Sequence, residues 1–262
     1  GNICGSVSAV GSVCPVPCSG GTGAANFEGN TGSKQIVTQA VSGINDESFS
    51  MSLWVQRRRV GVFEVLLTMG TTATREAVQL YFYPHNTMAF GFHGDTTITA
   101  SPYPADTDVW VHWSFVFNKL GNAMIIFRNG ISQSPQAGTP GSAPNGGVSA
   151  GTTSATGAIH LGVNKGNPSS YPFNGILDEF RLFEGRALTP ADVLTISQAS
   201  VSYNNLEGLT ISLSFDTAGS LTTDYSCGGS NNAASAFGVA STIGNICGSV
   251  SAVGSVCPVP SC

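Results

Sequence analysis

The chain has 262 residues, of which only 10% are charged, and ten Lys and Arg against fifteen Asp and Glu give a net charge of −5. This balance leaves no excess of cations to neutralise a phosphate backbone, so nucleic acid is not an expected partner. No apolar run approaches the roughly 18 residues that span a bilayer, and the start has no basic segment followed by an apolar one. We therefore expect a soluble chain without membrane insertion, either a mature product or an excised segment, with one large core.

The two ends of the chain, residues 1–25 and 227–262, are nearly uncharged and rich in Gly, Ser, Ala, Val and Cys, which is typical of extended connectors. Residues 1–17 read GNICGSVSAVGSVCPVP, and residues 244–260 repeat all seventeen positions at an offset of 243. We interpret the chain as slightly more than one period of a tandem array whose repeating unit is a whole domain. A duplicated linker flanking a single domain is the alternative.

All seven cysteines lie in these connectors: Cys4, Cys14, Cys18, Cys227, Cys247, Cys257 and Cys262. Cys247 and Cys257 are the repeats of Cys4 and Cys14, so one period holds four cysteines, an even number that suits disulfides. Disulfides indicate an oxidising, extracellular compartment. We expect a short Cys14–Cys18 bridge and a second bridge from Cys227 to Cys247. A zinc site is not favoured, because a second pair of ligands is missing.

Between the connectors, short segments rich in β-branched and aromatic residues are separated by Gly, Pro, Asn or Asp, which is typical of strands. They cover residues 48–55, 62–69, 77–83, 87–92, 109–117, 123–128, 158–163, 177–183 and 209–215. In the first segment every second residue from Phe49 to Val55 is apolar, so these residues should share one buried face. The three arginines that follow, residues 57–59, are interpreted as a solvated strand end.

Two local signals complete the secondary structure. Asn129-Gly130 predicts a hairpin, because both residues tolerate a positive φ. Thr189 and Pro190 predict the start of one helical turn, with Thr189 as N-cap and Pro190 at the first helical position. About ten strands and one short helical turn predict an all-β fold, a two-sheet antiparallel sandwich.

Several segments carry a family resemblance: Asn26-Phe27-Glu28-Gly29, residues 49–55, residues 110–115, Phe127-Arg128-Asn129-Gly130, and FNGILDEFRLF at 173–183 followed by Arg186-Ala187-Leu188-Thr189. Together they resemble the LamG-like jelly rolls of the concanavalin A-like lectin/glucanase group, over about residues 25–198. The last segment is the most specific, because it is similar to the end signature of the family. The resemblance implies a jelly-roll sandwich.

The chain departs from the family pattern in three places. Glu28 stands where the family has Asp, and Val111 stands where it has His. The outer strand that opens family members appears here near the far end, at residues 211–224, so the order is permuted. The strand at 209–215 therefore either folds back onto its own sandwich or completes the sandwich of the next copy. Its apolar face, the expected assembly element, consists of Leu209, Ile211, Leu213 and Phe215.

The carboxylates do not predict an enzyme. Glucanase relatives hold two carboxylates across one glycosidic bond, but Asp178 and Glu179 are adjacent and should point to opposite faces of a strand. We interpret this pair as structural partners of Arg181 and Arg186. Other catalytic motifs are absent from the sequence, and the four histidines are scattered singly. We expect no catalytic residue and no required cofactor.

Two kinds of binding site remain as candidates. Family members can hold Ca²⁺ at a sandwich rim, and the candidate ligands in loops are Asp95, Asp106 and Asp108. Glycans stack on exposed aromatic rings, and the candidate rings are Tyr81, Tyr83, Tyr103 and Tyr171. The sequence contains no N-glycosylation sequon, whereas residues 134–156 form a Gly, Ser, Thr, Ala and Pro tract that suits O-linked sugars.

The domain organisation predicted is a connector (1–25), a LamG-like sandwich (26–200), an additional strand (201–226) and a second connector (227–262). The first functional hypothesis is a non-enzymatic extracellular structural or adhesive module that assembles head to tail into a fibril, by strand complementation and disulfide-stapled connectors. The alternative is a glycan-binding lectin-type module that depends on Ca²⁺. A retaining glycosidase, by analogy alone, is the third hypothesis.

Overall fold

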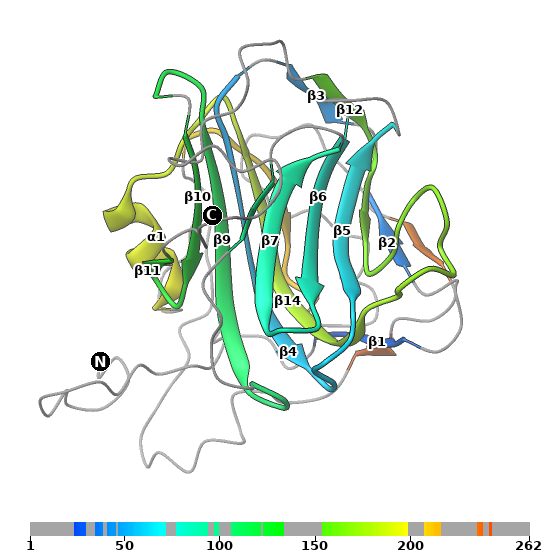
Figure 1. The fold of residues 1–262 in the computed structure, drawn as a ribbon. Coiled ribbons are helices and arrows are strands. Elements are labelled where there is room, and N and C mark those ends of the chain that lie inside the picture. Colours follow the sequence, from blue (N-terminus) through cyan, green and yellow to red (C-terminus); the bar gives the residue numbers. More distant parts are fainter. Residues whose placement is uncertain are drawn as a thin grey trace, which may run out of the picture.

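The computed structural model describes residues 24–29, 35–38, 41–45, 47–71, 77–93, 97–99, 106–121, 123–133, 154–198, 207–215, 235–237 and 241–242. These residues form two antiparallel sheets that pack face to face, as the sequence predicts. Figure 1 shows β5, β6 and β7 of one sheet as the near layer, with β4 and β14 of the other sheet behind them. No helix in the described part is long and apolar enough to cross a membrane.

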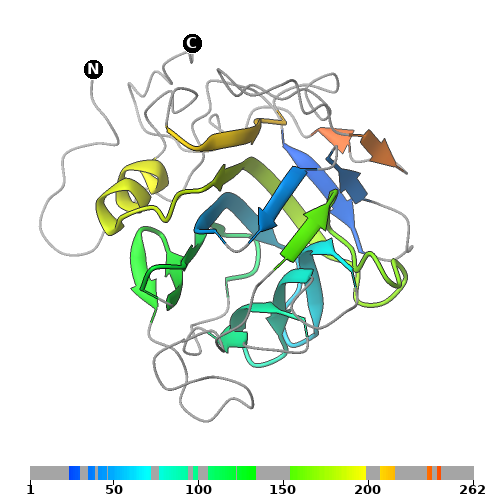
Figure 2. The same cartoon turned by 90° about the horizontal axis from the view of Figure 1, so that it is seen from above.

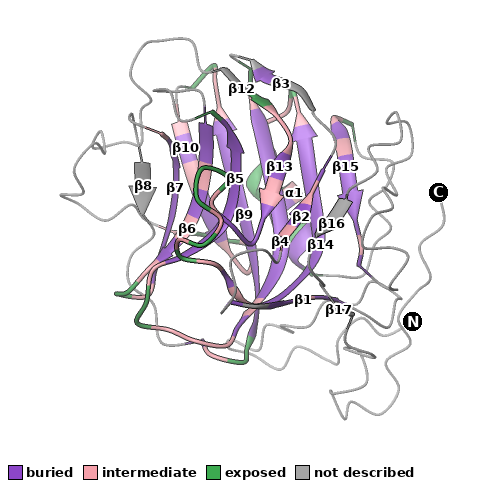
Figure 3. Cartoon of the chain, turned by 90° about the vertical axis from the view of Figure 1, so that its right-hand side faces the viewer, coloured by how far each residue is buried: buried purple, intermediate pink, exposed green. Residues whose placement is uncertain are grey.

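The first sheet is built around three long strands at its centre. In spatial order it contains β11 (Ile131–Gln133), β10 (Ala123–Arg128), β9 (Trp110–Asn118), β4 (Phe49–Arg57), β14 (Asn174–Glu184), β1 (Ala25–Glu28) and β17 (Ser241–Thr242), while β15 (Leu209–Leu213) also pairs with β14. In Figure 3, β4, β9 and β14 are buried along nearly their whole length, so both faces of this sheet are covered.

The second sheet forms the opposite wall of the core. In spatial order it contains β16 (Ser235–Phe237), β2 (Gln35–Val37), β13 (Ile159–Leu161), β5 (Glu64–Gly70), β6 (Ala77–Tyr83), β7 (Thr87–Phe92) and β8 (Thr97–Thr99). A separate two-stranded sheet joins β3 (Val41–Asn45) to β12 (Ser154–Gly157).

The core lies between the two sheets and follows the alternation of the strands. Phe49, Met51, Leu53 and Val55 of β4 all belong to it, which confirms the face predicted for this segment. Phe49 is packed among three other phenylalanines from the two walls, with ring centroids 5.5 to 6.2 Å apart. Edge-to-face packing of this kind contributes about 1 kcal/mol per pair beyond simple burial.

The predicted helical turn is a short helix, α1 (Pro190–Ser197), and it begins where the sequence places its cap. Thr189 Oγ1 accepts a hydrogen bond from the Asp192 amide, and the Asp192 carboxylate accepts one from the Thr189 amide at 2.9 Å. This reciprocal pair is a capping box. Val193 and Ile196 then pack with Phe127 and Phe183 on the outer side of the first sheet. Figure 2 shows α1 beside this sheet.

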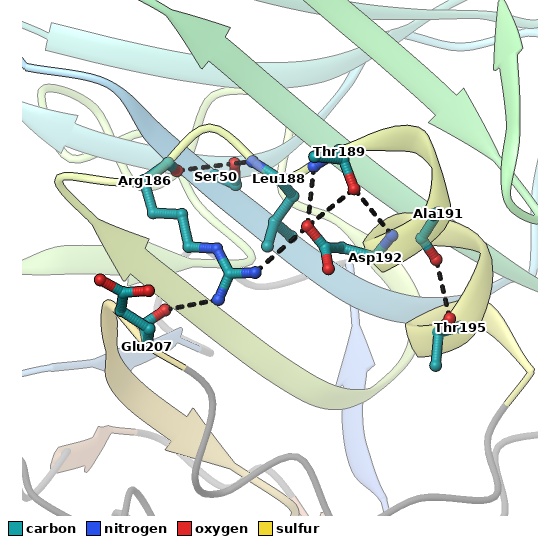
Figure 4. A network of polar contacts seen from close by, with 8 residues as sticks. All are labelled: Ser50, Arg186, Leu188, Thr189, Ala191, Asp192, Thr195 and Glu207. Carbon is teal, nitrogen blue, oxygen red and sulfur yellow. Dashed lines mark hydrogen bonds and ion pairs between the residues drawn. The ribbon is translucent and has the colours of Figure 1, made fainter.

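Polar contacts tie the start of α1 to its neighbours (Figure 4). Ser50 Oγ of β4 donates to the Arg186 carbonyl at 3.0 Å and accepts from the Leu188 amide at 2.9 Å. The Arg186 guanidinium lies 3.2 Å from Asp192 and donates to the Glu207 carbonyl at 2.9 Å, just before β15. Arg186 therefore pairs with Asp192 of the helix and not with Asp178 or Glu179, its predicted partners.

The strand at the far end of the chain lies in its own sandwich. β15 pairs antiparallel with β14, with Leu213 opposite Phe180 and Ile211 opposite Leu182. β16 and β17 likewise pair with β2 and β1 of the same chain. Ile211, Leu213 and Phe215 of the predicted apolar face are fully enclosed in the main core. Leu209, 8% exposed, does not share that face: the pairing of β15 with β14 shifts register beside it, and Leu209 packs with Phe183 in the cluster under α1.

Candidate functional site

Four aromatic side chains gather on the outer face of the second sheet, and we call them the aromatic cluster: Phe63, Tyr81, Tyr83 and Tyr171. The ring of Phe63 is the centre, with its centroid 5.0 Å from Tyr81, 5.5 Å from Tyr83 and 4.8 Å from Tyr171. Tyr81 and Tyr83 are 5.2 Å apart and nearly perpendicular, at 82°. The structure thus unites three of the four tyrosines predicted for glycan binding; Tyr103 lies outside the described residues.

The aromatic cluster forms one wall of a hollow of about 250 Å³. Its remaining lining comes from Val65, Thr68, Gln79 and Asn164. Among the residues that the structure describes, no charged side chain takes part in this lining. The described lining therefore combines aromatic rings with two amide groups, the Thr68 hydroxyl and three tyrosine hydroxyls, and it includes no Lys, Arg, Asp or Glu.

Side chains alternate between the two faces along β6, and this alternation sets the position of the Tyr81 and Tyr83 rings. Val78, Leu80 and Phe82 point into the core, so the intervening residues of this strand, including Tyr81 and Tyr83, stand on the outer face. Both tyrosines are only partly buried, so part of each side chain is exposed on this face. The period of two in QLYFY is the sequence signal for this arrangement.

Asn164 is placed by a loop after β13 that is tied to β5. Thr68 Oγ1 donates to the Val163 carbonyl at 3.1 Å and accepts from the Lys165 amide at 3.0 Å. One hydroxyl therefore holds both neighbours of Asn164. The Lys165 ammonium donates to the Gly70 carbonyl at 2.9 Å, which keeps the cation in a backbone contact.

A second group, which we call the charge cluster, consists of Arg57, Arg59, Glu64, Asp106 and Arg128. It adjoins the aromatic cluster through Glu64, which directly follows Phe63. Arg57 is 1% exposed, lies 3.7 Å from Glu64 and 3.5 Å from Asp106, and stacks over Phe82 at 4.1 Å. The interpretation of residues 57–59 as a solvated strand end is therefore wrong for Arg57. The run of three arginines in the sequence does not indicate that Glu64 and Asp106, two buried carboxylates outside this run, pair with Arg57.

Both carboxylates of the charge cluster are strongly desolvated. Burial raises the pKa of Glu64 above its usual value, although the nearby Arg59 acts in the opposite direction. Burial also raises the pKa of Asp106, against the lowering effect of Arg57 and Arg128. Such buried pairs fix the arrangement of the segments that meet there, since removing one partner leaves an uncompensated buried charge.

The aspartates proposed as calcium ligands have separate environments. Asp106 is 4% exposed and points its carboxylate at the guanidinium groups of Arg57 and Arg128, which already supply its positive partners. Asp108 is exposed with φ +59, and Asp95 lies outside the described residues. Among the described residues no three His, Cys, Asp or Glu side chains gather in a way that could hold a metal ion, and the calcium site stays a prediction.

Asp178 and Glu179 sit in an irregular part of β14. Glu179 has φ +54, and the pairing with β4 shifts register between Asp178 and Arg181. This is the geometry of a β-bulge, so the simple alternation assumed for these two residues does not apply. Glu179 forms an ion pair with Arg181, as predicted, and the Asp178 carboxylate accepts from the Glu179 amide at 2.9 Å.

Several predicted features lie outside the described residues. They include the seven cysteines, namely Cys4, Cys14, Cys18, Cys227, Cys247, Cys257 and Cys262, together with both copies of the duplicated segment. The disulfide pairing thus stays a prediction. Conversely, the sequence analysis did not identify Phe63, Gln79 or Asn164 as site residues. Phe63 lies directly before β5, and the two amide residues belong to no motif.

The fold and the aromatic hollow can be compared with known proteins. Residues 29–194 match the family described as the concanavalin A-like lectin/glucanases superfamily. The crystal structure of a Bacteroides ovatus protein, provisionally described as carbohydrate-binding, is 16% identical with a TM-score of 0.56, covering 85% of this chain and 61% of that chain. The chain thus spans 61% of the length of that relative.

The native heptameric SAP-like pentraxin of Limulus polyphemus is 15% identical with a TM-score of 0.50, covering 68% of this chain and 82% of that one. At these identities the likeness concerns the fold alone. Among curated protein sequences none matches this chain. The family match covers more than half of the 262 residues, so the chain belongs to the concanavalin A-like lectin/glucanases superfamily.

Proposed function

We propose that the chain is a non-enzymatic, extracellular glycan-binding module that takes a short, uncharged sugar chain in the aromatic hollow. The main observation that supports this proposal is the hollow itself, which is lined by four clustered aromatic rings together with Gln79 and Asn164. The superfamily and the carbohydrate-binding description of the Bacteroides relative support this reading.

The chemistry of the lining suits a sugar. One face of a pyranose ring carries C–H groups that pack on an aromatic ring, while its hydroxyls require hydrogen-bond partners in the plane of the sugar. The tyrosines supply the first kind of contact, and the amide groups of Gln79 and Asn164 supply the second kind. A hollow of about 250 Å³ is smaller than the roughly 300–1,000 Å³ of pockets for drug-sized ligands, so we expect one or two sugar units to enter it.

The test is binding to a panel of neutral trisaccharides, namely cellotriose, xylotriose, mannotriose and arabinotriose, beside the acidic 3′-sialyllactose. Titration calorimetry with the full chain should show binding to at least one neutral sugar. Tyr83→Ala should weaken it about tenfold or more, as for a central aromatic contact, and Tyr83→Phe should keep most of the affinity because it retains the ring.

The control is Leu120→Ala, which removes an apolar side chain that is 98% exposed and distant from the hollow in the fold. Its affinity should equal that of the wild type. The same titration in EDTA tests the calcium prediction: lost binding would assign a role to Ca²⁺, and unchanged binding is expected because the lining is uncharged. Absence of binding to every sugar, or equal affinity of Tyr83→Ala and wild type, would exclude the hollow as a glycan site.

A second proposal concerns the context in which the module works. The complete repetition of residues 1–17 at 244–260 favours a tandem array of sandwiches joined by Cys-containing connectors. In such an array weak sugar binding by one copy would be multiplied by its neighbours. Structural or adhesive assembly and glycan binding are then compatible roles of the same chain.

A further inference from the structure

Two rings of the aromatic cluster lie outside the strands: Phe63 directly precedes β5, and Tyr171 comes from the loop before β14. Tyr171 precedes β14, has φ +58, and exposes 57% of its side chain. A non-glycine residue rarely adopts this left-handed conformation unless its surroundings impose it. The contacts that fix the backbone around Tyr171 therefore decide where its ring stands relative to Phe63.

The start of β5 supplies two of these contacts. The Val65 amide donates to the Tyr171 carbonyl at 2.8 Å. The preceding residue, Glu64, accepts a hydrogen bond from the Asn174 amide at its Oε1 atom, at 2.9 Å. Two consecutive residues of one strand thus hold the loop on both sides of Pro172.

Arg59 supplies the third contact and joins the other two. Its Nη2 atom donates to the Pro172 carbonyl at 2.7 Å, and its Nε atom donates to Glu64 Oε1 at 2.7 Å. The planar guanidinium can make both bonds at once because its donors are fixed in one plane. Charge-assisted bonds of this length are about twice as strong as neutral ones.

The two residues of the ion pair, Arg59 and Glu64, differ in how far they are buried. Glu64 is fully buried whereas Arg59 is 35% exposed, so the carboxylate is the fixed end and the guanidinium reaches outward to the loop. The adjacent Arg58 differs: within the described part of the chain its side chain makes no hydrogen bond or ion pair, although its backbone amide bonds to Asn174. Arg58 is therefore a matched reference for Arg59, with the same charge one residue away.

We propose that Arg59 and Glu64 are positioning residues for the sugar site, because together they hold the loop that presents Tyr171 to Phe63. This inference rests on the proposed function of the aromatic hollow. Neither residue lines the hollow, so neither is expected to touch the sugar. Their effect on affinity should pass entirely through Tyr171.

The first test compares Arg59→Ala with Arg58→Ala, using the neutral trisaccharide that binds the wild-type chain most tightly in the panel above. Arg59→Ala should weaken binding about tenfold, and Arg58→Ala, with the same change in charge, should bind as the wild type does. Affinities are measured below the thermal transition of each variant. Equal affinities of the two variants would overturn the proposal.

A double-mutant cycle separates positioning from a merely structural effect. In a Tyr171→Ala background the ring is already missing, so Arg59→Ala should cause no further loss of affinity. A full further loss would show that Arg59 acts elsewhere and would overturn the proposal. If Arg59→Ala does not fold, Arg59→Lys takes its place: it keeps a cation for Glu64 but lacks the planar pair of donors, so it should fold and still lose affinity.

A sugar-free measurement distinguishes this inference from the proposed function. Hydrogen exchange of the Val65 amide, which bonds to Tyr171, should accelerate about tenfold in Arg59→Ala and not in Arg58→Ala. If no sugar binds but this exchange accelerates, the glycan proposal fails while the positioning of Tyr171 is confirmed. If the exchange is the same in both variants, the positioning role is excluded whether or not a sugar binds.

Discussion

At the scale of single residues, His112 is the titratable group with the most unusual surroundings. It is fully buried on the side of β9 opposite to Val111 and Trp113, and its ring lies 5.2 Å from that of Trp54. Within the described residues neither ring nitrogen has a hydrogen-bond partner. Burial, assisted by the positive charge of Arg181, lowers the pKa of His112 from 6.5 to about 3.

The lowered pKa of His112 predicts that the folded state loses stability in acid. The unfolded chain takes up a proton near pH 6.5, whereas the folded chain keeps His112 neutral until about pH 3, so stability falls as the pH drops through this window. Between pH 8 and pH 5 the group should cost about 2 kcal/mol of folding free energy. His112→Phe should remove that part of the pH dependence, as measured by urea unfolding at the two values.

The control for this prediction is His85→Phe, the same substitution on an exposed residue of the turn between β6 and β7. It should leave the difference between pH 8 and pH 5 as in the wild type. An unchanged difference in His112→Phe would show that His112 is not the group that titrates. The sequence analysis treated His112 only as one of four scattered histidines, because burial on the outer face of a covered sheet is a tertiary property.

At the scale of elements, alternation predicted the strands that line the core. β6, β7 and β10 begin and end as the sequence indicates, and the Thr189 cap and Pro190 start of α1 are confirmed. β2, β3 and β12 were not predicted, because these short strands carry too few apolar residues to show a period. The bulge at Glu179 was also missed, since a positive φ at a glutamate has no signal in a single sequence.

The predicted hairpin at Asn129-Gly130 is confirmed, and it has a second role in packing. Gly130 has φ +77, and a Cβ atom there would lie 2.6 Å from Ser197 Oγ and 2.8 Å from Leu194 Cδ1 of α1. Gly130→Ala should therefore destabilise the fold by about 2–3 kcal/mol, from backbone strain and from displacement of the helix. Thermal or urea unfolding measures this loss.

Gly61→Ala is the matched control for Gly130→Ala. Gly61 has the same φ of +77, but an added Cβ would meet nothing within 4 Å. It should cost only the backbone strain, about 1 kcal/mol. If the two variants lose the same stability, the contact between the hairpin and α1 contributes nothing, and the packing argument is wrong.

At the scale of the whole molecule, the sequence located the binding candidates but not the site. Tyr81 and Tyr83 could be placed on one face from their spacing, and Tyr171 was a candidate as an aromatic residue in a loop. That all three meet at Phe63 depends on the register of β5 with β6 and on the path of the 164–173 loop. Register and loop path arise from contacts between distant segments, which one sequence does not encode as a local pattern.

Two arrangements of a tandem array are compatible with the strand pairing. In the closed arrangement, β15 completes the sandwich that precedes it, as it does in the single chain, where Ile211, Leu213 and Phe215 pack in the main core and Leu209 packs in the cluster under α1. In the exchanged arrangement the same strand leaves and completes the next copy. Burial of these side chains contributes about 6–10 kcal/mol in either case, so burial alone does not distinguish the two arrangements.

Chain connectivity favours the closed arrangement. β15 begins 11 residues after Gln198 at the end of α1, and Arg186 bonds both to Asp192 of α1 and to Glu207 just before β15. A strand tethered so closely to its own slot has an effective concentration of the order of millimolar, which a neighbouring copy exceeds only at high protein concentration. We therefore predict that the 262-residue chain sediments as a monomer at micromolar concentrations under oxidising conditions, with no growth as concentration rises.

A two-copy chain with a protease site in the connector between the copies tests the same prediction in the array. After cleavage and reduction of disulfides, closed sandwiches should separate into two single copies on a sizing column, because only the connector joined them. Exchanged sandwiches should stay together until they are unfolded, since the second copy would hold the strand of the first. Co-elution of the cleaved halves would overturn the closed arrangement and make strand complementation the link between copies, whereas separation would leave the Cys-containing connectors as the element that holds an array together.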